Sequence, residues 1–511
     1  MSDWTSGYVA DIGYTFGYYN ELNPLRARLA FLNAGLVPPA QGTHCELGFG
    51  QGMSVNIHSA ATDSRWYATD FNPSQAGFAQ ELALVSGAHA QLQDEAFAEF
   101  CTRSDLPDFD SIGLHGIWSW ISDENRATIV DFVRRKLKVG GVLYISYNTQ
   151  PGWAAMVPMR DLLTEHAEVM GAEGVGIVNR IDAALDFTAK LMATHPTYAR
   201  ANPQVAERLE KIKGQNRNYL AHEYFNRDWQ PMAFARMAQW LQPAKLQWAC
   251  SAHYLDAIDA LNLTPVQQDL LKDITDPMFR QTVRDFCVNQ QFRKDYWVKG
   301  ARKLNPVEQA EALRMQRLML VTPRAEVSLK VNGALGEATM SEAIYAPILD
   351  LLADHKARTL GEIEEAAKEK GIAYAQVVQV AVVLAGAGHL ALVQDDHAIG
   401  QAKRQTERLN AYLCSKAQGS NDISYLASPV TGGGIAVNRF QQLFLASIAQ
   451  GKQQPGEWAQ SVWQILAAQG QKLVKEGKAL ETVEENLAEL TAQATAFAEK
   501  QLPLLKALQI G

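Results

Sequence analysis

The chain has 511 residues, with 47 Lys or Arg against 55 Asp or Glu, so its formal net charge at pH 7 is −8. This length predicts about three domains, and a hydrophobic content of 47% excludes a mostly disordered chain. The negative charge argues against a broadly basic nucleic-acid binder, so nucleic acid is not an expected partner.

Neither secretion nor membrane insertion is expected from the sequence. The N-terminal residues lack a basic and apolar signal segment, and no apolar run approaches the roughly 18 residues of a membrane span. None of the five cysteines lies in a CxxC pair, so we predict reduced thiols, no metal site and a cytoplasmic location.

The first 150 residues alternate between short β-prone runs and helical patterns. The β-prone runs cover 43–47, 66–69, 111–114 and 142–147. This alternation is typical of βα units and predicts an α/β fold with a doubly wound, Rossmann-like parallel sheet. From about residue 156 onward helical periodicity dominates, and few β-branched runs interrupt it.

Residues 340–396 have the element order of a winged-helix module. Helices are expected over 341–353, from Thr359 onward with Glu362 completing a capping box, and over 374–385; a strand at 389–393 would open a hairpin. The third helix carries no Lys or Arg, and phosphate contacts need cations. We therefore do not expect this module to bind DNA, and predict further helices over about 437–508.

The segment HCELGFGQG at positions 44–52 is the most informative motif. A predicted strand ends at Glu46, and Gly48, Gly50 and Gly52 follow at alternate positions, with Phe49 inside the loop. Glycines let the backbone turn tightly and let a ligand approach closely. The spacing differs from the GxGxxG dinucleotide fingerprint. E-x-G-x-G-x-G is the signature of class I S-adenosyl-L-methionine (SAM) methyltransferases.

Acidic residues recur where the next two strands end. Asp70 closes the second predicted strand, where a carboxylate can accept both ribose hydroxyls, and Phe71 follows it. Asp94 stands where these enzymes bond the adenine amino group, and the adjacent Glu95 competes for that role. These residues complete the predicted binding site for SAM.

The segment HGIWSW after the fourth predicted strand is expected to face the methyl acceptor. It is not the N/D-P-P-Y/F motif of DNA-adenine or glutamine-amide methyltransferases, so those acceptors are disfavoured. Trp118 and Trp120 are candidates for walls around an aliphatic or cationic substrate, with plain core packing as the alternative. His115 is either a general base beside the cofactor or a hydrogen-bonded structural histidine.

Aromatic residues near the N-terminus are candidates for a lid. Tyr14 and Tyr18 precede the first helix, where a hydroxyl could orient an amine; a packed cap is the alternative. Tyr147, at the end of the fifth strand, is expected to point to the substrate side. The sequence leaves a tyrosine, His115 and bulk water as alternatives for removing the proton of the amine.

Three stretches carry a more specific resemblance. HGIWSW, GGVLYISYNTQPGW and the following Arg160 resemble the bacterial outer-membrane-protein lysine methyltransferases, and residues 222–297 are similar to their methyltransferase regulatory domain. The resemblance covers nearly the whole chain. It implies SAM contacts at Glu46, Gly48, Gly50, Asp70 and Asp94. It also implies a substrate mouth near Tyr14, Tyr18, His115, Trp118 and Tyr147. Phe49 and Gln51 depart from the usual loop residues.

The combined prediction has three parts. Residues 1–165 would form the methyltransferase core with its lid, 166–320 a helical regulatory and substrate-docking domain, and 321–511 a winged-helix-like and helical part. The predicted reaction is SAM-dependent methylation of an amine, foremost a protein lysine. A small-molecule or natural-product methyltransferase and a non-catalytic SAM-binding scaffold are the alternatives. A homodimer is an assembly that the sequence leaves open.

Overall fold

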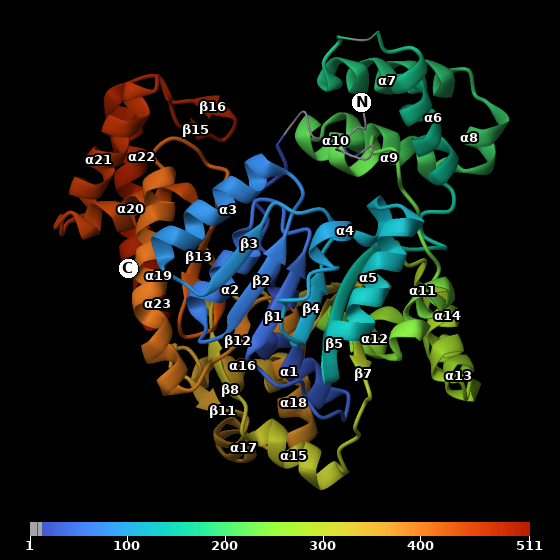
Figure 1. The fold of residues 1–511 in the computed structure, drawn as a ribbon. Helices are drawn as coiled ribbons and strands as arrows, with labels where there is room; N and C mark the ends of the chain where they lie inside the picture. The colour runs from blue at the N-terminus through green and yellow to red at the C-terminus, as the bar shows by residue number, and fades with distance from the viewer. Residues whose placement is uncertain (1–7, 9–12, 173) are drawn as a thin grey trace.

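The computed structural model describes residues 8, 13–172 and 174–511, and its centre is a seven-stranded sheet with the order β3-β2-β1-β4-β5-β7-β6 (Figure 1). The strands are β1 (Thr43–Leu47), β2 (Arg65–Thr69), β3 (Ala90–Gln93), β4 (Phe109–Leu114), β5 (Leu137–Asn148), β6 (Leu246–Ser251) and β7 (Phe292–Lys299). The first five strands are parallel, as predicted, and β7 is antiparallel to both of its neighbours.

Helices from the first 136 residues flank this sheet. They are α1 (Pro24–Asn33), α2 (Met53–Ala61), α3 (Pro73–Ser86), α4 (Phe97–Phe100) and α5 (Asp123–Lys136). Local sequence explains where they start: Asn72 caps α3 ahead of Pro73, and the Ser122 side chain accepts from the backbone N–H of Asn125. The apolar side of α5 packs on the sheet through Ile129 and Phe132.

The last two strands of the sheet correct the predicted division of the chain. Both β6 and β7 come from the region expected to be helical, so a boundary at residue 165 would cut through the sheet. Sequence periodicity missed β7 because two of its buried positions hold Arg293 and Asp295, which pair with each other at 2.8 Å. These polar residues interrupt the apolar run that marks a buried strand.

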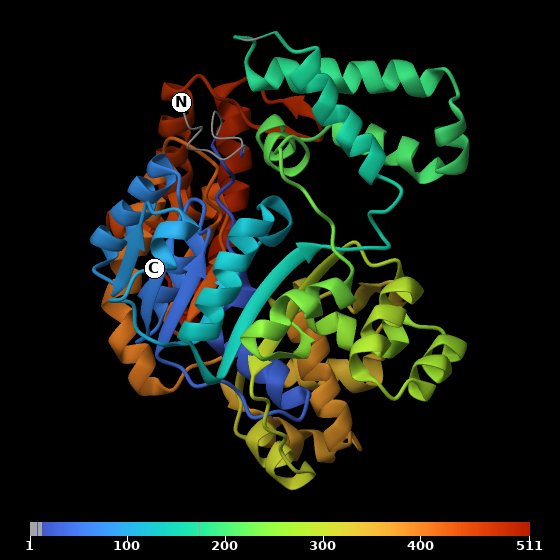
Figure 2. The same cartoon turned by 45° about the vertical axis from the view of Figure 1, so that its right-hand side comes forward.

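Helices inserted between β5 and β6 form a separate lobe beyond the carboxyl end of β5 (Figures 1 and 2). They are α6 (Val157–Val169), α7 (Ile177–Ala193), α8 (Thr197–Ala201), α9 (Pro203–Lys213) and α10 (Arg217–Tyr224). An apolar cluster of their own, including Leu163, Leu185 and Leu209, holds them together. We call these five helices the cap lobe.

Five further helices surround the β6–β7 edge. They are α11 (Phe234–Leu241), α12 (Asp259–Asn262), α13 (Pro265–Asp273), α14 (Pro277–Val288) and α15 (Pro306–Arg314). Phe234 of α11 stacks on Trp297 of β7, with ring centroids 5.5 Å apart. This edge of the sheet is thereby built into the same apolar core as α5.

A small sheet with the order β11-β8-β12 follows. Its strands are β8 (Arg317–Leu320), β11 (Arg358–Thr359) and β12 (Leu390–Leu392), and its helices are α16 (Glu342–Leu351), α17 (Leu360–Lys368) and α18 (Tyr374–Gly386). The three helices lie where they were predicted, and the Thr359–Glu362 capping box is present. The expected hairpin is wrong: β12 pairs with β8, which precedes the helices, and α19 begins at Asp396.

The C-terminal part returns to the first domain. Its helices are α19 (Asp396–Lys416), α20 (Arg439–Ala449), α21 (Pro455–Ala468), α22 (Val483–Ala496) and α23 (Leu502–Ala507). Short hairpins are formed by β9 (Lys330–Gly333) with β10 (Gly336–Thr339), β13 (Tyr425–Ser428) with β14 (Gly433–Ala436), and β15 (Val474–Lys475) with β16 (Lys478–Ala479). Leu409 and Leu413 of α19 share an apolar core with Met53 and Ile57 of α2. Among the described helices, none combines the length and apolarity that crossing a membrane requires.

Candidate functional site

A cavity of about 440 Å³ lies at the carboxyl ends of β1, β2 and β4, next to the cap lobe. Ligands of open α/β sheets bind at this edge. Residues predicted for cofactor and acceptor meet residues of α10 in its walls, which include Tyr8, Tyr14, Tyr19, Gly48, Phe49, Gly50, Asp70, Phe71, Glu95, His115, Trp120, His222 and Glu223.

The glycine turn after β1 needs glycine for two reasons. Gly48, Gly50 and Gly52 have φ of +75°, +57° and +71°, in the left-handed region that favours glycine. A Cβ at Gly48 would lie 2.5 Å from Ile117, and one at Gly52 would lie 2.3 Å from the Cβ of Ala79. Gly48 and Gly50 line the cavity, whereas Gly52 supports the packing of α2 against α3 behind it.

Asp70 is held in place by the turn itself. One carboxylate oxygen accepts from the N–H of Gly50 at 2.8 Å, and the other accepts from the N–H of Asn72 at 3.0 Å. Burial raises the pKa of Asp70 to about 6, and the two N–H donors oppose that rise. At neutral pH this carboxylate is therefore ionised, fixed in orientation, and exposed to the cavity.

Glu46 is a buried carboxyl that lacks a hydrogen-bond partner at one oxygen. Its side chain is 2% exposed, and its Oε2 has no hydrogen-bond partner in the described part of the chain. Burial, followed by the charge of Asp70, raises the pKa of Glu46 to about 8. A cationic group nearby would relieve both effects, because an opposite charge favours the ionised carboxyl.

After β3, Glu95 and not the predicted adenine contact Asp94 lines the cavity. Asp94 is exposed and lies outside the cavity, whereas Glu95 lines it. Glu95 is anchored by Arg103, with an Nη1–Oε1 distance of 3.0 Å, and its Oε2 is buried without a partner among the described residues. Of the two adjacent acids, Glu95 is thus the one available to a ligand.

His115, at the end of β4, forms the opposite wall. Its Nδ1 is hydrogen-bonded to the hydroxyl of Tyr144 at 2.7 Å, and its ring stacks on Tyr19 with centroids 3.5 Å apart. Burial lowers the pKa of His115 to about 3, so the ring is neutral at pH 7. This low pKa makes the ring a weak proton acceptor.

Tyr14 is the one predicted acceptor tyrosine that lies in the cavity. Its ring meets His222 of α10 edge-on at 5.0 Å, and its hydroxyl is hydrogen-bonded to that of Tyr19. Glu223 follows on the same helix, and burial raises its pKa to about 7. His222 and Glu223 were not predicted as site residues, because only the fold brings α10 over the strand ends.

Three predicted acceptor residues lie elsewhere. Tyr18 packs between His58 and Tyr425 in a neighbouring cavity. Trp118 is fully buried in the core, edge-on to Trp240. Tyr147 is also buried and donates to a carboxylate oxygen of Asp295 at 3.0 Å.

Strand alternation explains the error at Tyr147. Successive side chains of a strand point to opposite faces, so the neighbours of Tyr147 on the other face are the ones near the cavity. Tyr144 bonds His115, and the Ser146 hydroxyl accepts from the N–H of Gly116 at 2.7 Å.

Comparison with known proteins identifies the family. The chain is 42% identical to the uncharacterized protein sll1526 of Synechocystis sp. over 513 residues, which covers 99% of this chain and 100% of that protein. The chain belongs to the family of that protein. A family model described as a predicted methyltransferase regulatory domain matches residues 216–299, from α10 to β7.

More distant relatives show the fold. PKMT2 from Rickettsia typhi, in a structure with AdoHcy, has a TM-score of 0.69 at 17% identity, covering 95% of this chain and 98% of that one. The protein RP789 of Rickettsia prowazekii is 27% identical over 213 residues, 40% of this chain and 37% of that protein. The structural likeness confirms the predicted Rossmann-like methyltransferase fold for this family member.

Proposed function

We propose that this protein is a SAM-dependent methyltransferase that methylates an amine, foremost the side chain of a protein lysine. One observation carries the proposal: a single cavity joins the glycine turn and the ionised Asp70 to an aromatic wall of Tyr14, Tyr19 and His115. The resemblance of HGIWSW and SYNTQPGW to the outer-membrane-protein lysine methyltransferases supports the choice of acceptor.

The acidic groups that line the cavity, Asp70 and Glu95, and the buried Glu46 behind its glycine turn fit the polar groups of SAM. Asp70 would accept from the ribose hydroxyls, and Glu95 Oε2 from the adenine amino group. Glu46 would hold the ammonium of the methionine end, which supplies the cationic partner that its buried Oε2 lacks. When bound, SAM supplies a methyl group on a sulfonium, and the aromatic wall would align the acceptor nitrogen with it.

The aromatic wall of Tyr14, Tyr19 and His115 would also affect the protonation of the acceptor amine. Only an amine without its extra proton is a nucleophile, and burial disfavours the charged form of a lysine. The tyrosines keep their protons, since burial raises the pKa of Tyr19 to about 12. We infer that desolvation at this wall promotes loss of the proton to water, with the Tyr14 and Tyr19 hydroxyls orienting the amine.

The test is methyl transfer from tritiated-methyl SAM to fractionated cell protein, followed by mass spectrometry of the labelled material. Label on lysine side chains, lost in Asp70→Asn and retained in the matched surface variant Asp63→Asn, is the expected result. Label confined to small molecules would refute the lysine acceptor and indicate a small-molecule methyltransferase. SAM binding without turnover on any fraction would indicate a scaffold.

A further inference from the structure

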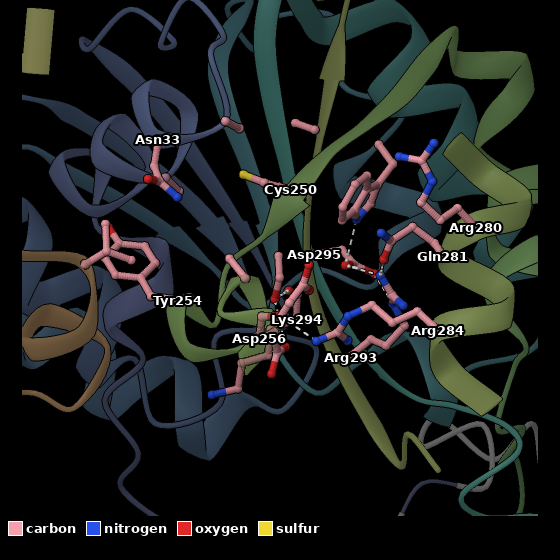
Figure 3. Close-up of a pocket in the computed structure, with 18 of the residues that line it drawn as sticks. Asn33, Cys250, Tyr254, Asp256, Arg280, Gln281, Arg284, Arg293, Lys294 and Asp295 are labelled. Atoms are coloured by element: carbon pink, nitrogen blue, oxygen red, sulfur yellow. Dashed lines mark hydrogen bonds and ion pairs between the residues drawn. The ribbon is translucent and has the colours of Figure 1, made fainter. Parts of the chain in front are cut away.

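A second cavity of about 420 Å³ lies on the other side of the β6–β7 edge, between α1, β6, β7 and α14 (Figure 3). Most of its wall belongs to the segment 216–299 matched by the regulatory-domain model. None of the predicted cofactor residues lines it, so it is a different site from the one described above.

The wall of this cavity is basic although the whole chain carries a net charge of −8. Three carboxylates line it, those of Asp256, Asp259 and Asp295. Five basic side chains line it, those of Lys272, Arg280, Arg284, Arg293 and Lys294. A basic wall of this kind favours an anionic ligand.

Three of these basic residues already have acidic partners, and one of them is Lys272, which pairs with Asp269 at 2.9 Å. Arg293 is buried and pairs with Asp295 at 2.8 Å and with Asp285 at 2.5 Å. Lys294 pairs with Glu21 at 2.6 Å. They build the floor of the cavity and have little charge left for a ligand.

Arg280 and Arg284 differ from them. They lie one turn apart on the same face of α14 and are half-buried. Arg280 donates from Nε to the carbonyl of Ile274 at 3.0 Å, and Arg284 reaches across the cavity to the carbonyl of Asp256 (Figure 3). Within the described residues, neither guanidinium has a carboxylate oxygen within 4.0 Å. Both are held in position without an ion pair at that distance, and the charge of Arg284 favours the ionised forms of Asp256 and Asp285.

Asp256, which interacts with the charge of Arg284, has its hydrogen-bond partners elsewhere. The Asp256 carboxylate accepts from the Ser251 hydroxyl at 2.9 Å and bonds His253 at 3.0 Å. The rest of the wall is apolar or aromatic, with Leu29, Ala30, Trp248, Tyr254, Leu271 and Val382. Such a wall would accommodate the body of a ligand whose charged head meets the two arginines.

We propose that this cavity binds a small organic anion, with a phosphate or carboxylate head on Arg280 and Arg284 and an apolar or aromatic body against Trp248 and Tyr254. Guanidinium forks match both head groups. The proposal does not rest on the methyltransferase activity, because its test reads binding alone.

The experiment is isothermal titration calorimetry of the full chain with phenyl phosphate, benzoate and inorganic phosphate. We expect saturable binding of phenyl phosphate, tighter than that of inorganic phosphate and weakened by added NaCl. Tighter binding of phenyl phosphate than of benzoate would assign a phosphate head, and the reverse order a carboxylate head. Absence of saturable binding of both aromatic anions at millimolar concentration would overturn the proposal.

Variants place the binding at α14. The double variant Arg280→Gln/Arg284→Gln should weaken phenyl phosphate at least about tenfold, since two charged hydrogen-bond donors are lost. Arg404→Gln on the surface of α19 is the matched control and should leave binding unchanged. If the Gln variant fails to fold, Arg280→Lys/Arg284→Lys keeps both charges and should retain most of the affinity. Equal affinity of the folded Gln variant, or displacement by saturating S-adenosylhomocysteine, would refute this site.

Discussion

At the scale of single residues, Asp70 in the cavity wall and the buried Glu46, which does not line that cavity, are two carboxyls in different protonation states. Burial raises the pKa of Glu46 to about 8 and that of Asp70 to about 6, so at pH 7 the first is protonated and the second ionised. Such pairs are typical of functional sites, because ionising a buried carboxyl without a partner reduces folding stability. Protonation spares the free protein this cost at Glu46, and a cationic ligand would favour the ionised carboxyl.

The first prediction concerns Asp70. Asp70→Asn should weaken SAM binding by about 1–3 kcal/mol, because charge-assisted hydrogen bonds to the ribose hydroxyls are lost. Stability should change little: Asn cannot accept from both Gly50 and Asn72, but a buried charge is removed. Calorimetric titration with SAM and urea unfolding measure the two effects, with Asp63→Asn as the exposed control. An unaltered dissociation constant for Asp70→Asn would contradict the assigned role.

The second prediction concerns the pH dependence of Glu46. Its folded pKa of about 8 exceeds the ordinary value of 4.5, so the stabilisation it gives is complete below pH 4.5 and is lost as pH rises through 8. Glu46→Gln cannot ionise and should escape this loss. Between pH 6 and pH 8 the ligand-free wild type should lose about 2 kcal/mol relative to Glu46→Gln.

Urea unfolding at the two pH values checks this difference. The exposed Glu165→Gln is the matched control and should follow the wild type at both. Parallel pH curves for the wild type and Glu46→Gln would mean that Glu46 ionises normally.

The residue scale also shows what sequence could and could not predict. Asp70 was predictable because the end of a parallel strand fixes the sheet edge at which its side chain lies. Tyr147 was not, because side chains alternate between faces and a shift of one residue reverses the assignment. Asp94 and Glu95 were both candidates, and the sequence could not decide between them because they lie in the loop after β3, where side-chain direction follows no strand alternation.

At the scale of elements, the turn from β1 into α2 depends on glycines for different reasons, and this gives the third prediction. Gly52→Ala should destabilise the protein by about 2–4 kcal/mol, because the new Cβ would lie 2.3 Å from that of Ala79 at a φ of +71°. Gly77→Ala on the exposed face of α3 is the matched control. It has open space around it and should stabilise the helix by about 0.5–1 kcal/mol. Thermal and urea unfolding measure both, and equal stability of the two variants would refute the packing argument.

The helices and strands also differ in how well the sequence predicts them. The strands of the first 150 residues and the helices α16, α17 and α18 carry local signals, namely apolar runs and a capping box, and lie where predicted. The strand β7 has Arg293 and Asp295 at buried positions, which only a paired partner makes tolerable. That pairing is tertiary, as is the approach of α10 to the cavity, and neither is visible in local periodicity.

At the scale of the whole molecule, the C-terminal part forms the far wall of a large cleft. A cavity of about 810 Å³ lies between the first domain and residues of β12, β13 and β14, and it shares Tyr19 and His115 with the cofactor cavity. The stacked pair thus separates two spaces, one lined by Asp70 and Glu95 and a second of the larger volume. An acceptor lysine entering from the cleft would reach this pair first.

The fourth prediction concerns a substitution that narrows the cleft without touching the cofactor site. Ala391 of β12 lines the cleft and lies outside the cofactor cavity, so Ala391→Trp should fill part of the acceptor path. We expect an unchanged dissociation constant for SAM and a kcat/KM for the labelled protein acceptor at least about tenfold lower, since a displaced acceptor loses alignment with the methyl group. Ala353→Trp, at an exposed position after α16, is the matched control and should keep both values. Undiminished transfer by a folded Ala391→Trp would show that the acceptor arrives by another route, past Trp120 and the cap lobe, where the cofactor cavity meets α10.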